Sequence, residues 1–245
     1  EEFGEWLNEI RGNTTVVVSE VRPIPLYQHV LIGQRLVDLF SKPGQVNPEI
    51  LKLEREAMRK VHTERNRRER FGQNESRLSR ADIIEKLNRE NLLPAITFIF
   101  SRAGCDAAVN QCLNAGLRLT NSEERAEITK TALYYTQNLA EEDLAVLGFD
   151  QWLSALERGI AAHHAGLLPS FKEAIEDLFK RGYIKAVFAT ETLALGINMP
   201  ARTVVLEKLT KWNGEAHVPI TPGEYTQLTG RAGRRGIDIE GNAVV

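Results

Sequence analysis

The residues best suited to phosphate chemistry lie in the segment 227–236, which reads QLTGRAGRRG. Arg231 and Arg234 are three positions apart, so in a helix they would project from one face about one turn apart. A guanidinium group carries a permanent charge and a fork of N–H donors, which suits it to the spread charge of a phosphoryl group in transfer. The alternative is a solvent-facing basic turn whose arginines pair with acids such as Asp238 or Glu240.

Two further segments carry polar groups just after predicted strands. The segment 189–200, ATETLALGINMP, would place hydroxyls and unpaired backbone amides at a helix start, where the helix dipole favours an anion. A threonine cap followed by a helix stop is the alternative there. In the segment 98–102, FIFSR, the hydroxyl of Ser101 and the guanidinium of Arg102 could grip a nucleic-acid backbone.

The adjacent histidines His163 and His164 raise the question of a metal site. Neighbouring residues on an extended strand point to opposite faces, so the two rings cannot easily hold one ion. No Cys, Asp or Glu close by in the sequence completes a ligand set, and we predict no metal site. We expect one histidine to pack inward and the other to face the ligand side.

The elements that must position these groups alternate between strand and helix patterns. We expect strands, or strand ends, at 14–19, 26–32, 95–100, 161–165, 185–190 and 203–206. We expect helices at 103–115, at 122–160 with breaks near Gly148, at 169–181 and from 222 towards 233. This alternation predicts an α/β fold with a mostly parallel sheet, in which ligands gather beyond the carboxyl ends of the strands.

The bulk composition limits the class of protein. Of 245 residues, 42% are hydrophobic, which is enough for a sizeable core. The net charge of −2 and the isoelectric point near 6.3 give no long-range field for a polyanion, so any nucleic-acid contact must be local. No apolar run approaches a membrane span, and we expect a cytoplasmic protein with no membrane partner. Cys105 and Cys112 fit buried core thiols.

A polar, charge-dense stretch occupies residues 41–90. Within it Lys and Arg outnumber acids about two to one between residues 52 and 80, which fits a solvated loop or a basic arm that touches phosphate. The chain starts at Glu1 without an initiator methionine and ends on Val244 and Val245. From these ends we expect it to be part of a longer protein.

Taken in order, these segments resemble the carboxyl-terminal RecA-like domain of superfamily 2 helicases. Residues 98–102 resemble motif IV, 163–167 (HHAGL) the loop that follows it, 189–200 motif V and 227–236 motif VI. The run 206–238 is similar in sequence to the Ski2-like DExH subgroup, and most similar to its actinobacterial member. The resemblance implies a RecA-like α/β fold of the P-loop NTPase type, a mostly parallel sheet with helices on both faces.

The resemblance also assigns roles to individual residues. Those that would contact ATP are Gln227, Arg231, Arg234, Gly196 and Asn198. Of these, Gln227 and the two arginines would be catalytic, with the arginines acting as fingers on the phosphates. Those that would contact the nucleic-acid backbone or line the strand-binding edge are Ser101, Arg102, Thr190, His164 and Gly166.

The activity implied by the resemblance is that of an ATP-dependent helicase. It would move 3′ to 5′ along single-stranded RNA or DNA, with RNA favoured, and would use ATP with Mg²⁺. The chain contains no G-x-x-x-x-G-K-[ST] loop and no D-E-x-H box. The magnesium ligands would therefore lie in a first RecA-like domain of the same polypeptide, and this chain alone would be inactive.

The resemblance divides the chain into four parts. Residues 1–13 would be the tail of the first RecA-like domain, and 14–40 would hold the first strands of the second. Residues 41–90 would be a charged insertion or linker, and 91–245 the core of the second domain. A non-catalytic module that binds nucleic acid or protein is an alternative. A Rossmann dehydrogenase is disfavoured, because no G-x-G-x-x-G follows a first strand.

Overall fold

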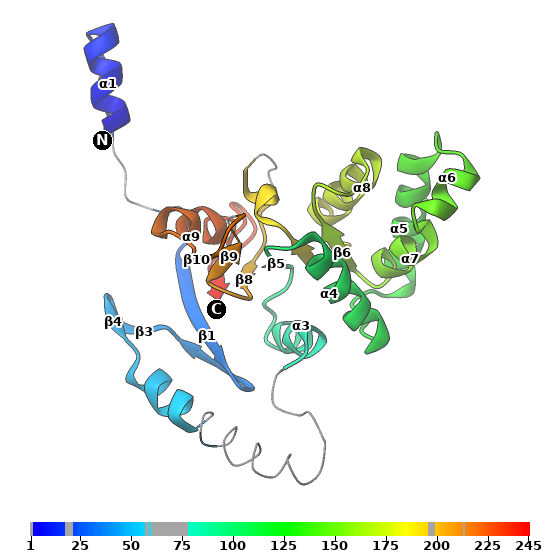
Figure 1. Cartoon of the computed structure of the whole chain (residues 1–245), viewed down its shortest axis with the longest axis horizontal. Helices are drawn as coiled ribbons and strands as arrows, with labels where there is room; N and C mark the ends of the chain where they lie inside the picture. Colours follow the sequence, from blue (N-terminus) through cyan, green and yellow to red (C-terminus); the bar gives the residue numbers. More distant parts are fainter. Residues whose placement is uncertain (1, 18–21, 57–58, 60–77, 196–198, 213) are drawn as a thin grey trace.

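A seven-stranded sheet forms the centre of the computed structural model, which describes residues 2–17, 22–56, 59, 78–195, 199–212 and 214–245 (Figure 1). Its strands are β1 Leu26–Ile32, β2 Arg35–Asp38, β5 Ala95–Phe98, β6 Ile160–His163, β7 Ala186–Ala189, β8 Thr203–Leu206 and β11 Gly241–Val244. They lie in the order β2-β1-β11-β8-β5-β7-β6. All neighbours are parallel except β1 and β2, which confirms the predicted mostly parallel sheet.

The inner strands are apolar because helices cover both faces of the sheet. β5, β7, β8 and β11 are buried along their full length. A strand covered on both faces reads as a continuous apolar run, and the predicted range 203–206 coincides with β8. Residues 14–17 form no strand, so the strand predicted at 14–19 is wrong there, and residues 18 and 19 lie outside the described part. A short β-branched run becomes a strand only where a neighbouring strand pairs with it.

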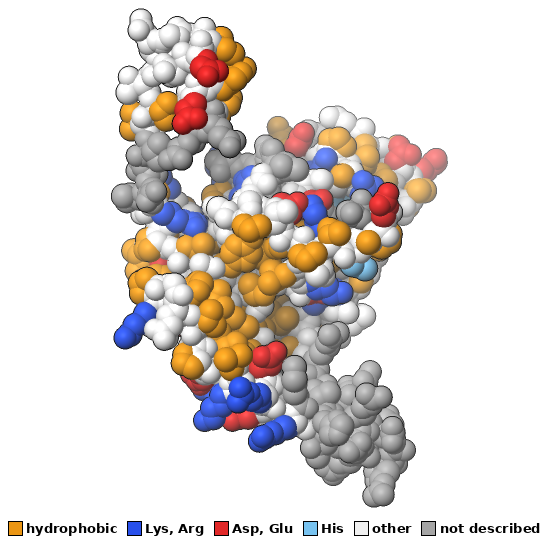
Figure 2. Space-filling model, turned by 60° about the vertical axis from the view of Figure 1, so that its left-hand side comes forward, with side chains coloured by type: hydrophobic (Ala, Val, Ile, Leu, Met, Phe, Trp, Pro, Cys, Tyr) orange, Lys and Arg blue, Asp and Glu red, His pale blue; other side chains and the backbone are white. Residues whose placement is uncertain are grey.

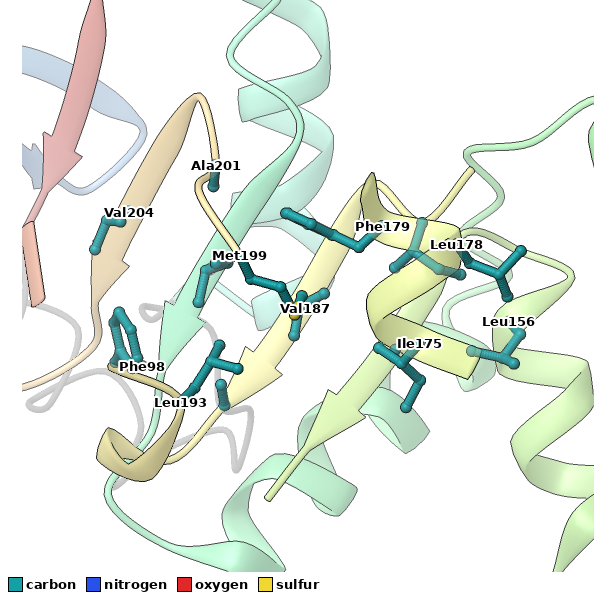
Figure 3. Packing of buried hydrophobic residues seen from close by; sticks show 14 of the residues in the cluster. Phe98, Leu156, Ile175, Leu178, Phe179, Val187, Leu193, Met199, Ala201 and Val204 are labelled. Atoms are coloured by element: carbon teal, nitrogen blue, oxygen red, sulfur yellow. The ribbon is translucent and has the colours of Figure 1, made fainter. Parts of the chain in front are cut away.

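Two apolar clusters lie on opposite faces of the sheet. One face carries α5 Ser122–Thr136, α8 Pro169–Lys180 and α9 Pro222–Thr229, and the other carries α3 Arg80–Arg89 and α4 Arg102–Asn114. Along β5, Ile96 and Phe98 join the first cluster while Ala95 joins the second, as the two-residue period of a strand requires. Figure 3 shows Ile175 and Leu178 of α8 packed over the sheet in the first cluster.

Local signals set the ends of the helices. Asn121 Oδ1 accepts a hydrogen bond from Glu124 N at 2.9 Å, and Asn121 N donates to Glu124 Oε2 at 2.9 Å, and this capping box starts α5 at Ser122, where the predicted helix begins. The predicted helical stretch 122–160 divides into α5, α6 Glu141–Val146 and α7 Phe149–Leu156. Gly148, at the predicted break, has a φ of 70°, a conformation that glycine adopts without strain.

Helix α3 lies within the range 41–90, for which we predict a charged insertion or linker. Ile84 and Leu87 of α3 are 1% and 2% exposed and belong to the same cluster as Cys105 and Cys112 of α4. Both cysteines are fully buried, which confirms their assignment as core thiols. The packed core therefore includes residues before 91, because a charged helix can still bury one apolar stripe.

Helix α1, Glu2–Arg11, projects from the body of the molecule (Figures 1 and 2). Phe3, Trp6 and Ile10 recur at helical spacing, and they are 70%, 52% and 62% exposed. After β2 in the chain, β3 Phe40–Lys42 pairs with β4 Gln45–Val46 in a small antiparallel hairpin. Within the described ranges, no helix has the length and apolar character needed to span a bilayer.

Candidate phosphate and nucleic-acid interface

The predicted nucleic-acid residues follow three neighbouring strands. β7 lies between β5 and β6, and Phe98 and His163 both pair with Ala189 of β7. Because the three strands are parallel, their carboxyl ends meet at one edge of the sheet. The predicted residues that follow these ends are Ser101, Arg102, Thr190, His164 and Gly166. The structure therefore brings all five to the same edge.

Ser101 and Arg102 form the start of α4. Ser101 Oγ accepts a hydrogen bond from Gly104 N at 3.2 Å and caps the helix, and Arg102 is its first residue. Both side chains are exposed. A Cβ on Gly104 would lie 2.7 Å from Ile99 Cγ2, so the helix start packs tightly on the end of the strand segment. Backbone N–H groups at the start of a helix can donate hydrogen bonds to an anion.

Thr190 joins the ends of β7 and β6. Its backbone N donates to His163 O at 3.3 Å, and its Oγ1 lies 2.9 Å from Thr192 Oγ1 in η1, a 3-10 helix over Glu191–Leu195. The chain after β7 therefore offers two hydroxyls close to the strand ends. Two predicted site residues further along this segment lie outside the described residues, namely Gly196 and Asn198.

The two histidines point to opposite faces of the sheet, as predicted. His163 Nε2 lies 2.9 Å from Glu176 Oε1 of α8, and His164 Nε2 lies 3.0 Å from Asp106 Oδ1 of α4. The two residues are 3% and 5% exposed. The expectation that one of them faces the ligand side is therefore wrong, because each ring is drawn inward to a carboxylate on a covering helix.

His164 holds the turn that follows it at this edge of the sheet. Its Nδ1 accepts a hydrogen bond from Gly166 N at 3.1 Å, so the ring proton sits on Nε2, which donates to Asp106. A Cβ on Gly166 would lie 3.1 Å from His164 Nδ1 and 3.6 Å from Arg102 Cδ. A glycine there allows the turn to approach both side chains. In the part of the chain that the structure describes, no group of three or more His, Cys, Asp or Glu residues could hold a metal ion.

The arginine-bearing segment leaves α9 as a loop. α9 ends at Thr229, so the helical arrangement considered for Arg231 and Arg234 does not occur and the two do not share a helix face. Ala201 N donates to Arg231 O at 3.0 Å, and Gly233 N donates to Ala201 O at 2.7 Å. These two bonds hold the loop against the chain that leads into β8.

The chain before β1 supports the loop from another side. Arg22 Nη2 donates to Ala232 O at 2.5 Å, and burial lowers the pKa of Arg22. Gly233 has a φ of 87°, and a Cβ on it would lie 2.6 Å from Ile24 Cγ2. No sequence pattern indicates Arg22, because its partner lies 210 positions away.

Arg234 is held by a buried carboxylate. Its Nε and Nη2 donate to Asp238 Oδ2 and Oδ1, and its backbone N donates to Oδ2, all at 2.8 Å. The side chain of Asp238 is 4% exposed and that of Arg234 is 21% exposed. Burial alone would raise the pKa of Asp238, but the hydrogen bonds from Arg234 outweigh it and the pKa lies below its usual value. The pairing with Asp238 considered as an alternative is therefore present at Arg234.

The other two predicted catalytic residues lie close to this loop in the chain. Gln227 is exposed on α9, and Arg231 is half-buried just beyond the helix. Burial lowers the pKa of Arg231, but a guanidinium remains charged at neutral pH. Permanent positive charges at partly buried positions can stabilise developing negative charge on a phosphoryl group.

A cavity of about 410 Å³ lies at the ends of β5 and β8. The chain leaves β5 towards β6 and β7 on one side and returns as β8 on the other, and ligands of open α/β sheets gather at such a point. The hairpin of β9 Thr210–Trp212 and β10 His217–Pro219 forms one wall. Ser101 lines the cavity together with Lys208 and Trp212, which is 54% exposed.

Lys211 of β9 connects the segments predicted to contact phosphate. Its Nζ donates to Glu191 Oε2 at 3.0 Å and to Glu224 Oε1 at 2.6 Å. Glu191 begins η1 and Glu224 lies in the first turn of α9, so one ammonium ties the hairpin to both. Sequence reasoning missed Lys211, since neither carboxylate lies within one helical turn of it in the chain.

Comparison with protein families matches residues 111–236 to the helicase conserved C-terminal domain. Probable helicase HelY of Mycobacterium leprae is 58% identical over 260 residues, which cover 100% of this chain and 28% of the relative. DExH-box ATP-dependent RNA helicase DExH15 chloroplastic of Arabidopsis thaliana is 38% identical over 282 residues, with 100% and 23% covered. Antiviral helicase SKI2 of Saccharomyces cerevisiae is 40% identical over 181 residues, with 74% and 14% covered.

The chain thus spans 28% of the length of the mycobacterial relative and less of the other two. The family match begins in the last turn of α4 and runs past the end of α9. The three relatives are all named as helicases, one of them as a DExH-box helicase and one as SKI2. This chain belongs to the helicase conserved C-terminal domain family, within the Ski2-like group of superfamily 2 that its ordered segments resemble.

Proposed function

We propose that the chain is the second RecA-like motor domain of an ATP-dependent nucleic-acid helicase. RNA is the favoured substrate, because relatives are named as RNA helicases, and DNA is the second choice. The single observation that carries the proposal is the loop of Arg231 and Arg234, which is held by backbone hydrogen bonds to Ala201 beside the chain segment that follows β7. In this proposal Gln227 and the two arginines act on the phosphates of ATP.

The described residues suit the polyphosphate of ATP better than its metal ion. Guanidinium groups fit phosphate oxygens, whereas Mg²⁺ prefers carboxylate, phosphate and water oxygens in octahedral geometry. No acidic cluster suited to a metal occurs within the described ranges. We therefore place the magnesium ligands in a first RecA-like domain of the same polypeptide, with Gly196 and Asn198 on the nucleotide side of this one.

The edge formed by the ends of β5, β7 and β6 is proposed to bind one strand of nucleic acid. Ser101 and Arg102 would contact its backbone at the start of α4, together with Thr190. Gly166 would let the nucleic-acid strand approach closely, and the buried His164 would hold the turn at Gly166 in place through the hydrogen bond that it accepts from Gly166 N. The direction of movement, 3′ to 5′, and a cytoplasmic location come from the resemblance alone and stay predictions.

The proposed division of the chain follows the resemblance with one change. Residues 1–13 are proposed as the tail of the first domain, 14–40 as the first strands of the second and the part of 41–90 that precedes α3 as an insertion or linker. The core proposed at 91–245 is extended to include α3, because that helix is packed in the second cluster.

The proposal is tested by ATP hydrolysis of the full-length polypeptide, with and without single-stranded RNA and single-stranded DNA. Arg231→Ala and Arg234→Ala should each lower turnover by about a thousandfold or more, the scale on which arginine fingers act, while ATP binding persists. Arg235→Ala, which removes the neighbouring exposed arginine, is the matched control and should retain most activity. RNA should stimulate more than DNA.

A non-catalytic binding module is the second candidate. The pairing of Arg234 with Asp238 favours it, because a paired arginine has a structural role that needs no phosphate. Absence of turnover by the full-length polypeptide with either nucleic acid would support this candidate. Turnover that persists in both arginine variants would exclude the assigned roles.

A further inference from the structure

Asp238 contacts Arg234 in a way that leaves part of the guanidinium available. The carboxylate accepts hydrogen bonds from Nε and Nη2 of Arg234, each at 2.8 Å. A guanidinium also carries two N–H groups on Nη1 and a second one on Nη2. These remaining N–H groups could donate hydrogen bonds to a phosphate while the contact with Asp238 is kept.

The turn around Arg234 is closed on itself. Asp238 N donates to Arg234 O at 2.9 Å, while Arg234 N donates to Asp238 Oδ2 at 2.8 Å. Ile237 N also donates to Arg234 O, at 3.1 Å. The backbone and the side chain of Arg234 are therefore both held by the same residue, four positions further along the chain.

The burial of Asp238 gives this contact its strength. Its side chain is 4% exposed, so water does not compete effectively for the carboxylate. Arg202 adds a second positive charge that helps to keep Asp238 ionised. The bidentate arrangement fixes the plane of the guanidinium as well as its position, whereas a single hydrogen bond would let it rotate.

We propose that Asp238 is a positioning residue for Arg234, which keeps the guanidinium in one orientation so that its remaining N–H groups meet the transferring phosphoryl group. The inference rests on the proposed function, because it requires Arg234 to act on phosphate. A catalytic group that is already oriented loses no conformational freedom when the substrate arrives, and a misplacement of about 1 Å can reduce the rate about a hundredfold.

The test uses ATP hydrolysis by the full-length polypeptide with saturating single-stranded RNA. Asp238→Asn keeps the shape of the side chain but removes the charge and one acceptor position. We expect kcat to fall about 10- to 100-fold while KM for ATP changes by less than about twofold. Glu240→Gln removes a neighbouring charge and is the matched control, which should leave both constants unchanged.

A double-mutant cycle separates orientation from general stability. In an Arg234→Ala background, Asp238→Asn should cause no further loss of kcat, because the residue that it orients is gone. Asp238→Glu, which keeps the charge but displaces the carboxylate by one methylene, is the second variant and should also lose kcat. Thermal unfolding of each variant identifies those that fold.

The outcomes distinguish this inference from the proposed function. If Arg234→Ala lowers kcat about a thousandfold while a folded Asp238→Asn or Asp238→Glu protein keeps the original kcat, the positioning role is overturned and the finger remains. Equal further loss in the Arg234→Ala background would also overturn it, since the effect would then not pass through Arg234. If Arg234→Ala leaves hydrolysis intact, the proposed function itself fails.

Discussion

Gly241→Ala should disturb the arginine-bearing loop without touching any charged residue. Gly241 begins β11, next to the loop, and a Cβ built on it would lie 2.6 Å from Ala232 C and 2.7 Å from both Ala232 O and Gly233 N. These neighbours are backbone atoms, which cannot swing away as the end of a flexible side chain can. The loop between Arg231 and Arg234 must therefore move, or β11 must shift in the sheet.

The size of the effect follows from the cost of overpacking. Inserting a methyl group into a well-packed site costs about 1–3 kcal/mol, while replacing glycine by alanine stabilises by about 0.4–1 kcal/mol through the unfolded chain. Taking the middle of each range, the net loss of unfolding free energy is about 1–2 kcal/mol. For a domain of this size each kcal/mol corresponds to about 2–4 °C, so we expect Tm to fall by about 2–8 °C.

The matched control is Gly223→Ala in the first turn of α9. The nearest atom to a Cβ there is Thr221 Oγ1 at 4.0 Å, so alanine fits without a clash. Alanine also favours a helix, and Tm should stay the same or rise by about 1–4 °C. Thermal unfolding by calorimetry measures both variants, and ATP hydrolysis of the full-length polypeptide reports on the loop. A Gly241→Ala protein with unchanged Tm and unchanged turnover would refute the reasoning.

Three further predictions can be checked directly. The isolated chain should hydrolyse ATP no faster than background even with RNA present, because it contains no phosphate-binding loop, and clear turnover by the pure chain would contradict this. Burial raises the pKa of Cys105 to about 12 and that of Cys112 to about 11, so both thiols should react with a chromogenic disulfide only after denaturation. Burial lowers the pKa of His163 in the folded chain in spite of Glu176, so the unfolded chain binds the proton first as pH falls. Stability should therefore decline as pH drops below about 6.5, and the decline should be smaller in His163→Gln.

Strand positions were predictable where the chain is buried on both faces. The runs that became β5, β7 and β8 are short, continuous and apolar, which is typical of strands covered by helices on both faces. The run at 14–19 has similar composition but forms no strand over 14–17. Pairing decides this, and a partner strand is not visible in a local window.

Helix α3 shows how composition can hide an element. Charges dominate the stretch 41–90, yet Ser79 and Asp82 form a capping box and Ile84 and Leu87 share one buried face. The capping signal was present in the sequence and would have located the helix. The average over a long window conceals it, because only a narrow stripe of a surface helix needs to be apolar.

The sequence by itself determined the mostly parallel α/β sheet and the kinds of residue at its carboxyl edge, because both follow from local periodicity and residue chemistry. Only the tertiary structure decided which groups within the chain form hydrogen bonds and ion pairs with one another. Asp106 holds His164 and Arg22 holds the loop at Ala232, across 58 and 210 positions of the chain. Arg234 could have paired with Asp238 or Glu240, and burial selected Asp238. Such choices depend on which groups folding removes from water together, and no local pattern encodes that.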